Sequence, residues 1–151
     1  MGGSCMRKFE NYDASLRVLR EAPSQDLSNE FVLGGVIDKF SLQFELGWKL
    51  LKALLAYEGS SVAATGSPRD MLKEAFRYYD FMDDALWLSM LRDRNNTAHV
   101  YDARAARRLA DTVIGVYLPE FERLRDGLLA RYGAMLTEPD AAATMTSHDV
   151  E

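Results

Sequence analysis

Hydrophobic residues recur every three or four positions along most of the chain, a spacing that predicts α-helices rather than strands. The first predicted helix covers residues 7–21 and ends before Pro23, because the residue preceding a proline avoids the helical conformation. Its apolar side consists of Phe9, Tyr12, Leu16 and Leu19. Charged residues lie between these positions, so the pattern is that of a helix with one side buried.

A long second helix is predicted over residues 26–57, with Asp26 or Ser28 as its N-cap residue and Gly59 just beyond its end. Its central apolar stripe consists of Phe31, Val36, Phe40, Phe44, Trp48, Leu51 and Leu55. Further leucines and valines widen this stripe, and a helix with so broad an apolar surface contacts more than one neighbour. We expect some apolar surface to remain, which indicates a homodimer. Gly34 and Gly35 mark either a weak point or a place of close packing.

Small residues over 59–66 predict a loop, and Ser67 followed by Pro68 is a strong signal for the start of a helix that ends near Tyr78. Asp83 or Asp84 is expected to begin the next helix.

The last long helix is predicted over residues 103–132, with Asp102 as its cap and Gly133 as its stop. Pro119 lies inside this span and should kink or interrupt the helix, because proline lacks an N–H and its ring clashes with the preceding turn.

These elements predict an all-α, up-and-down bundle of four or five helices. We expect residues 1–6 to be an expression tag or disordered start, 7–133 to form the domain, and 134–151 to be a disordered acidic tail. The single cysteine, Cys5, is expected to be an exposed thiol without a disulfide partner.

The net charge of −5 argues against a general binder of polyanions, but the charge is unevenly distributed. Residues 137–151 hold four of the 23 acidic residues and no Lys or Arg, which leaves 18 basic and 19 acidic residues elsewhere. The body of the protein is therefore nearly neutral, without a broad basic face. No apolar run approaches the roughly 18 residues that span a bilayer, and the start lacks a signal-peptide pattern, so we expect a cytoplasmic protein.

The segment 94–101, Arg-Asn-Asn-Thr-Ala-His-Val-Tyr, concentrates the candidate chemistry. Arginine presents a planar fork that fits phosphate oxygens, and histidine exchanges a proton near neutral pH. In one continuous helix Arg94 and His99 would lie about 140° apart. We therefore expect a helix break near Ala98, or a site completed by a second subunit. Further candidates for phosphate or RNA binding are Arg92, Arg104, Arg107 and Arg108.

A purely structural role also accounts for the segment. His99 would then cap helix carbonyls, Tyr101 would lie at the edge of the core, and Arg94 would form an ion pair with Asp93, Asp102 or Glu74. Similarly, Glu45 and Lys49 are most simply a helix-stabilising pair four residues apart. Histidine and cysteine are too few to predict a metal site, and no nucleotide-cofactor motif is present, so we expect no cofactor.

Arg94-x4-His99-x-Tyr101 resembles the Arg-x4-His-x-Tyr motif of the HEPN superfamily, in its HepT-like branch. The segment 40–49, Phe-Ser-Leu-Gln-Phe-Glu-Leu-Gly-Trp-Lys, is similar to a block of the nucleotidyltransferase substrate-binding protein-like family, with Ser41 in place of a glutamate. Residues 67–69, 74–76 and 87–91 also resemble that family, so the likeness covers roughly residues 7–133.

The resemblance implies a homodimeric helical bundle that acts beside a minimal nucleotidyltransferase. In such proteins the Arg and His form a metal-independent RNase site at the dimer cleft, which the partner silences by transferring AMP to the motif tyrosine. Carried onto this chain, Arg94 would bind the scissile phosphate, His99 would act as general acid and base, and Asn95 would be a polar helper. Tyr101 would accept the AMP.

Three functions remain open at this point. The first is the RNase toxin of a toxin–antitoxin pair, acting on tRNA or mRNA, and the intact motif favours it. The second is a non-catalytic substrate-binding subunit of a two-component nucleotidyltransferase. The nearly neutral body of the chain favours this function, or else a small RNA target such as a tRNA end. The third is a structural bundle in which the motif is accidental.

Overall fold

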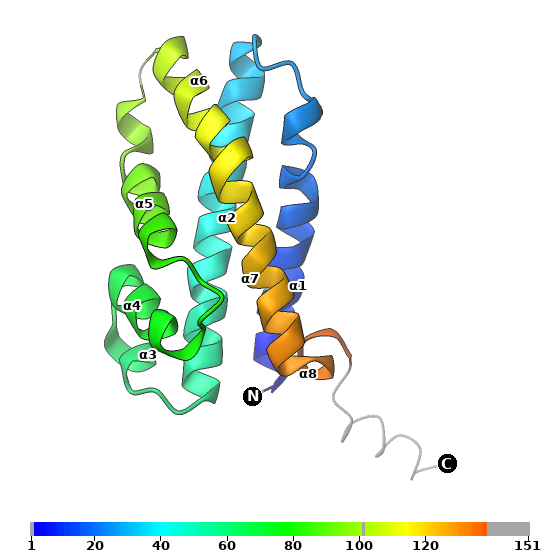
Figure 1. Cartoon of the computed structure of the whole chain (residues 1–151), viewed down its shortest axis with the longest axis vertical. Coiled ribbons are helices and arrows are strands. Elements are labelled where there is room, and N and C mark those ends of the chain that lie inside the picture. The colour runs from blue at the N-terminus through cyan, green and yellow to red at the C-terminus, as the bar shows by residue number, and fades with distance from the viewer. Residues whose placement is uncertain (1, 101, 139–151) are drawn as a thin grey trace.

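The computed structural model describes residues 2–100 and 102–138 and is an all-α, up-and-down bundle (Figure 1), as the sequence predicted. The helices are α1 (Gly2–Leu19), α2 (Glu30–Tyr57), α3 (Val62–Thr65), α4 (Pro68–Tyr78), α5 (Asp84–Asn95), α6 (Ala103–Thr112), α7 (Leu118–Tyr132) and α8 (Ala134–Thr137). Short 3₁₀ turns cover Ala22–Ser24 and Thr97–His99, and a π-helical segment, Val113–Tyr117, joins α6 to α7.

The long helix α2 is the centre of the bundle, since it packs against α1, α3, α4, α5 and α6. Its broad apolar surface therefore meets several neighbours, as predicted. The aromatic core lies between α2 and the last helices: the ring of Phe40 stacks on that of Tyr117 with centroids 5.4 Å apart, and Trp87 meets Phe121 edge to face at 5.6 Å. Aromatic pairs of this kind add to the stabilisation that burial alone provides.

The first helix begins at Gly2 rather than at residue 7, so the predicted disorder is wrong for residues 2–6, and the expression tag stays a prediction. Cys5 continues the apolar side of α1, four residues before Phe9, and only 2% of it is exposed. The expectation of an exposed thiol is therefore wrong, and burial raises the pKa of this thiol.

At the other end of the chain, α8 packs against α1 and buries Leu136 completely. The predicted disordered tail is therefore wrong for residues 134–138, while residues 139–151 lie outside the described residues. Packing between the two chain ends, which local sequence does not reveal, orders both segments.

Most of the predicted helix boundaries are confirmed. Ser67 caps α4 in a reciprocal arrangement with Asp70, and Asp83 caps α5 by accepting a hydrogen bond from the Leu86 N–H at 3.1 Å. Gly59 (φ 85°) and Gly133 (φ 57°) follow α2 and α7 in conformations that favour glycine. In addition, the segment predicted as a loop over 59–66 contains the single-turn helix α3.

The start of α2 differs from the prediction. Asn29 is its N-cap residue, and its Oδ1 accepts a hydrogen bond from the Phe31 N–H at 2.8 Å. Asp26 instead accepts from the N–H and hydroxyl of Ser28 and so stabilises the turn before the helix. Each of these polar residues favours caps and turns, so composition alone does not distinguish the capping position.

Pro119 interrupts the last helix as predicted, and the form of the interruption is the π-helical segment. The Leu118 N–H donates to the Val113 carbonyl, five residues back. Because Pro119 has no N–H and its ring would meet the carbonyl of Gly115 in a regular α-helix, the turn before it widens.

Beyond the proline, Glu120 is buried, with 1% exposed, and accepts hydrogen bonds from the Trp87 indole at 3.0 Å and the Asp83 N–H at 2.8 Å. This carboxylate fixes the start of α5, the helix whose other end carries Arg94.

Candidate functional site

The helix break that the sequence predicted lies between α5 and α6. The helix α5 ends at Asn95, slightly before the expected position at Ala98, and the 3₁₀ turn Thr97–His99 follows. Hydrogen bonds that hold the turn include those from the Thr97 hydroxyl to the Arg94 carbonyl at 3.0 Å, from the His99 N–H to the Asn96 carbonyl at 2.9 Å and from the Val100 N–H to the Thr97 carbonyl at 3.2 Å. The segment lies at the end of the bundle remote from the N-terminus (Figure 1).

The side chain of Arg94 is held against α2. Its guanidinium carbon lies 5.4 Å from the centroid of the Phe44 ring, and Nη1 lies 3.4 Å from Oε2 of Glu45. The predicted ion-pair partners Asp93, Asp102 and Glu74 are therefore wrong. The Arg94 side chain is 27% exposed, whereas its Nε is buried without a hydrogen-bond partner among the described residues. The cation is thus oriented by α2 while part of it remains accessible.

Glu45 is the residue that sequence reasoning missed. The predicted pair with Lys49 is present at 3.5 Å, but the same carboxylate also accepts a hydrogen bond from the Trp48 indole at 3.0 Å and pairs with Arg94. The resemblance in segment 40–49 contained both Phe44 and Glu45 and was the available signal, although it did not indicate a contact with Arg94.

The other motif residues lie at the surface. Asn95 and His99 are exposed, so a molecule bound from solvent could reach both side chains. Tyr101 lies outside the described residues. Asp102 follows as the cap of α6, accepting a hydrogen bond from the Ala105 N–H at 2.7 Å, as predicted.

The four further arginines form two groups. Arg92 and Arg108 line one groove between α5 and α6, although Arg92 also contacts the Ser89 hydroxyl at 3.0 Å. Arg104 and Arg107 are exposed on α6, and Arg107 pairs with Asp111 at 3.1 Å. The structure thus brings Arg92 and Arg108 together across the two helices.

A stripe on α2 is exposed beside the site. It consists of Phe31, Gly35, Asp38 and Leu42, which the helical spacing of four, three and four residues places on one side. Phe31 is 92% exposed and Leu42 44%. A Cβ added at Gly34 or Gly35 would meet nothing within 4 Å, so these glycines are not places of close packing within the chain.

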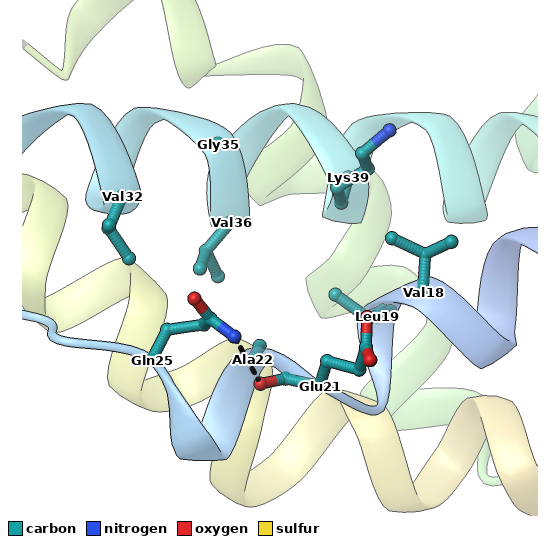
Figure 2. A pocket seen from close by; sticks show the side chains of 9 residues that line it. All are labelled: Val18, Leu19, Glu21, Ala22, Gln25, Val32, Gly35, Val36 and Lys39. Carbon is teal, nitrogen blue, oxygen red and sulfur yellow. Dashed lines mark hydrogen bonds between the residues drawn. The ribbon is translucent and has the colours of Figure 1, made fainter.

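Grooves lie on both sides of this exposed stripe. One is formed with the motif segment and is lined by Gly34, Ile37, Asp38, Thr97, Val100 and Asp102, among others. The other lies between α1 and α2 and is mainly apolar (Figure 2), with Val18, Leu19, Val32 and Val36 in its walls. In the first groove, α2 lies next to the turn that contains His99. The second groove contains no motif residue.

Within residues 2–100 and 102–138, no group of three or more His, Cys, Asp or Glu side chains converges in a way that would hold a metal ion. None of the helices in the same residues is both long enough and apolar enough to cross a membrane.

The bundle and its motif place the protein in the HEPN-like, HepT-like class. The chain belongs to the nucleotidyltransferase substrate binding protein like family, whose model matches residues 7–130. It is similar to the "Probable ribonuclease HepT" of Haemophilus influenzae, with 31% identity over 77 residues, which are 50% of this chain and 53% of that protein. The match thus spans about half the length of this relative.

Proposed function

We propose that this protein is a metal-independent endoribonuclease and the toxin of a toxin–antitoxin pair whose other member is a minimal nucleotidyltransferase. The observation that carries the proposal is the arrangement of Arg94 and His99. Arg94 is oriented by α2 at the end of α5, and the helix break directly after it places His99 in an exposed turn. The likeness to a protein named as a ribonuclease supports the same assignment.

The chemistry requires a cation and a proton carrier. The 2′-hydroxyl of the RNA attacks the adjacent phosphorus, the bond to the 5′-oxygen breaks, and a cyclic phosphate is left on the first fragment. Arg94 stabilises the charge that develops on the phosphate oxygens. His99 takes the proton of the attacking 2′-hydroxyl and, once protonated, supplies a proton to the leaving 5′-oxygen, and Asn95 assists as a polar neighbour.

The protein acts as a homodimer in this proposal. The exposed stripe on α2 offers Phe31 and Leu42 to a second copy, and burying such side chains favours association. Glu45 lies on α2 one turn beyond Leu42, so the interface in this proposal lies beside the Arg94 site of each copy. RNA would then lie along the groove of Arg92 and Arg108, with Arg104 and Arg107 beside it.

The partner nucleotidyltransferase silences the toxin by transferring AMP to Tyr101. Tyr101 is two residues from His99, so a bulky and negatively charged group on its hydroxyl would obstruct RNA at the catalytic residues. The family description names a nucleotidyltransferase, which supports this partner.

A second candidate function is a non-catalytic subunit that presents substrate to the nucleotidyltransferase. The pairing of Arg94 with Glu45 favours it, because a neutralised cation attracts a phosphate less strongly than a free one. The nearly neutral body of the chain favours it as well.

The deciding experiment induces the wild type alone, beside Arg94→Ala and His99→Ala, and follows growth and RNA integrity in the same cultures. Arg7→Ala is the matched control, since Arg7 is an exposed arginine on α1 outside the motif. If the RNase proposal is correct, the wild type and Arg7→Ala arrest growth and cleave RNA. Arg94→Ala and His99→Ala then do neither. Intact RNA with all four soluble proteins, in a host without the partner, would place the substrate-binding function first.

The silencing step has its own test. Co-expression with the nucleotidyltransferase, followed by mass spectrometry of the intact protein, should show addition of AMP to the wild type and none to Tyr101→Phe. Addition of AMP at another residue would contradict the assignment of Tyr101.

A further inference from the structure

We propose that Glu45 is a positioning residue of the site, which holds the guanidinium of Arg94 in the orientation that engages a phosphate. This inference rests on the proposed ribonuclease function, and it concerns a residue on α2 that lies outside the Arg-x4-His segment. It assigns to Glu45 a role beyond that of a partner for Lys49 within one helix.

The two carboxylate oxygens of Glu45 have different partners. Oε1 faces Lys49 at 3.5 Å, which is the ordinary pair between residues four positions apart on one helix. Oε2 accepts the hydrogen bond of the Trp48 indole at 3.0 Å and lies 3.4 Å from Nη1 of Arg94. The indole thus fixes the oxygen that faces Arg94, while the pair with Lys49 leaves that oxygen available.

Arg94 has few other restraints on its orientation. It is the last residue but one of α5, and the residues that follow leave the α-helix. The Phe44 ring supports one face of the guanidinium, but such a contact permits rotation in the plane of the ring. Nε is buried and has no hydrogen-bond acceptor within the described ranges. Among the contacts of Arg94 described above, the pair with Glu45 therefore fixes the direction in which the remaining N–H groups point.

The expected contribution is to catalysis rather than to folding. Arg94 and Glu45 are both partly exposed, with 27% and 32% of their side chains accessible, and ion pairs of this kind stabilise proteins little. A small displacement of a group that acts on the transition state, in contrast, lowers the rate strongly. Loss of Glu45 should therefore lower kcat while stability and KM change little.

The test compares Glu45→Ala, Glu45→Gln and Lys49→Ala in RNA-cleavage kinetics with the full-length protein. We expect Glu45→Ala to lower kcat by about 10- to 100-fold, the range seen when a reacting group is misplaced. Glu45→Gln should recover part of this loss, because its amide oxygen can still accept from Trp48 and Arg94. Lys49→Ala should leave kcat within about twofold of the wild type, since it does not disturb the Oε2 contacts. Unchanged kcat in Glu45→Ala would overturn the proposal.

A second measurement does not depend on RNase activity. The Nε–Hε signal of Arg94, assigned by its loss in Arg94→Lys, should report an ordered side chain in the wild type and in Lys49→Ala. In Glu45→Ala it should become as mobile as that of exposed Arg7. If the wild type cleaves no RNA, the proposed function fails, and this signal still decides whether Glu45 orients Arg94. An equally ordered signal in Glu45→Ala would refute the positioning role in either case.

Discussion

Tyr117 donates a hydrogen bond from its hydroxyl to Oδ2 of Asp93 at 2.5 Å and so joins the π-helical segment to the last turn of α5. The Tyr117 ring also stacks on Phe40 of α2, so three segments of the bundle meet at one side chain. Because Asp93 directly precedes Arg94, this contact supports the part of α5 that carries the site. Burial, followed by the hydrogen bond to the Asp93 carboxylate, raises the pKa of Tyr117 to about 12.

This raised pKa predicts a loss of stability at alkaline pH. Between about pH 10, the ordinary pKa of tyrosine, and about pH 12, the unfolded chain releases the Tyr117 proton while the folded chain keeps it. The unfolded state then binds fewer protons, so the free energy of unfolding falls as pH rises. Tyr117→Phe should be less stable than the wild type at pH 8, by about 1.5–3 kcal/mol for a hydrogen bond to a charged group. The difference in the free energy of unfolding between Tyr117→Phe and the wild type should be smaller at pH 11.5 than at pH 8.

Urea unfolding of both proteins at the two pH values measures this change. Tyr79, whose pKa burial raises to about 12, and Tyr132, whose pKa is also raised, contribute equally to both proteins. A difference that stays constant between the two pH values would show that Tyr117 does not titrate in this window.

The buried carboxylate of Glu120 should be a major contributor to stability. In Glu120→Ala the buried Trp87 indole and the partly buried Asp83 N–H lose their acceptor. An unsatisfied buried donor costs about 1–3 kcal/mol and a partly buried one costs less, so we expect the free energy of unfolding to fall by roughly 2–4 kcal/mol. Glu122→Ala is the matched control, because Glu122 pairs with Arg20 near the surface and its loss should cost about 1 kcal/mol or less. Equal losses in the two variants, measured by urea unfolding, would contradict the role of Glu120.

Gly127 should resist substitution for steric reasons. A Cβ at this position would lie 2.3 Å from Cδ2 of the Phe81 ring, so Gly127→Ala must displace the ring or α7. Overpacking of this kind typically costs about 1–3 kcal/mol. At Gly115, in contrast, a Cβ meets nothing within 4 Å, and Gly115→Ala should be neutral or stabilising by up to about 1 kcal/mol. Thermal unfolding of the two variants gives the comparison, and a stable Gly127→Ala protein would argue against the close contact.

The proposed homodimer gives a prediction for Phe31. If the exposed stripe on α2 is the interface, Phe31→Asp should convert a dimer into a monomer in sedimentation equilibrium without changing the helical circular-dichroism spectrum. Val116→Asp is the control, since Val116 is 42% exposed on the π-helical segment, away from the stripe. Dissociation by Val116→Asp alone would move the interface to the side of the bundle formed by α5 and α6.

The features of the fold that the sequence predicted correctly are those that depend on interactions between residues close together in the chain. Ser67, Asp83 and Asp102 each cap a helix by binding an N–H within three residues, so the sequence itself contains the signal. The errors at Cys5 and Leu136 have the opposite origin. Both side chains are buried because α1 and α8 pack together, and these helices come from opposite ends of the chain.

In the candidate site, too, sequence predicted the local features and missed the contact between distant segments. The spacing of Arg94 and His99, together with the poor helix formers between them, predicted a break that the structure confirms. The predicted ion-pair partners of Arg94 are acids near α5 or on α4, and they are wrong because Glu45 reaches Arg94 from the central helix. Only the packing of α5 on α2 determines that contact.

The π-helical segment has a consequence for how this gene can change. Since the Leu118 N–H reaches back five residues to Val113, this turn holds one residue more than α-helical geometry would place there. Deleting a single codon within residues 113–117, together with a replacement of Pro119 so that no proline ring meets the preceding turn, would return the turn to α-helical spacing and keep α6 and α7 in phase with each other. The same deletion in the middle of α2 would rotate every later side chain of that helix by about 100°. The last helix therefore contains a position at which the length of the chain can vary while both of its halves keep their sides toward the core.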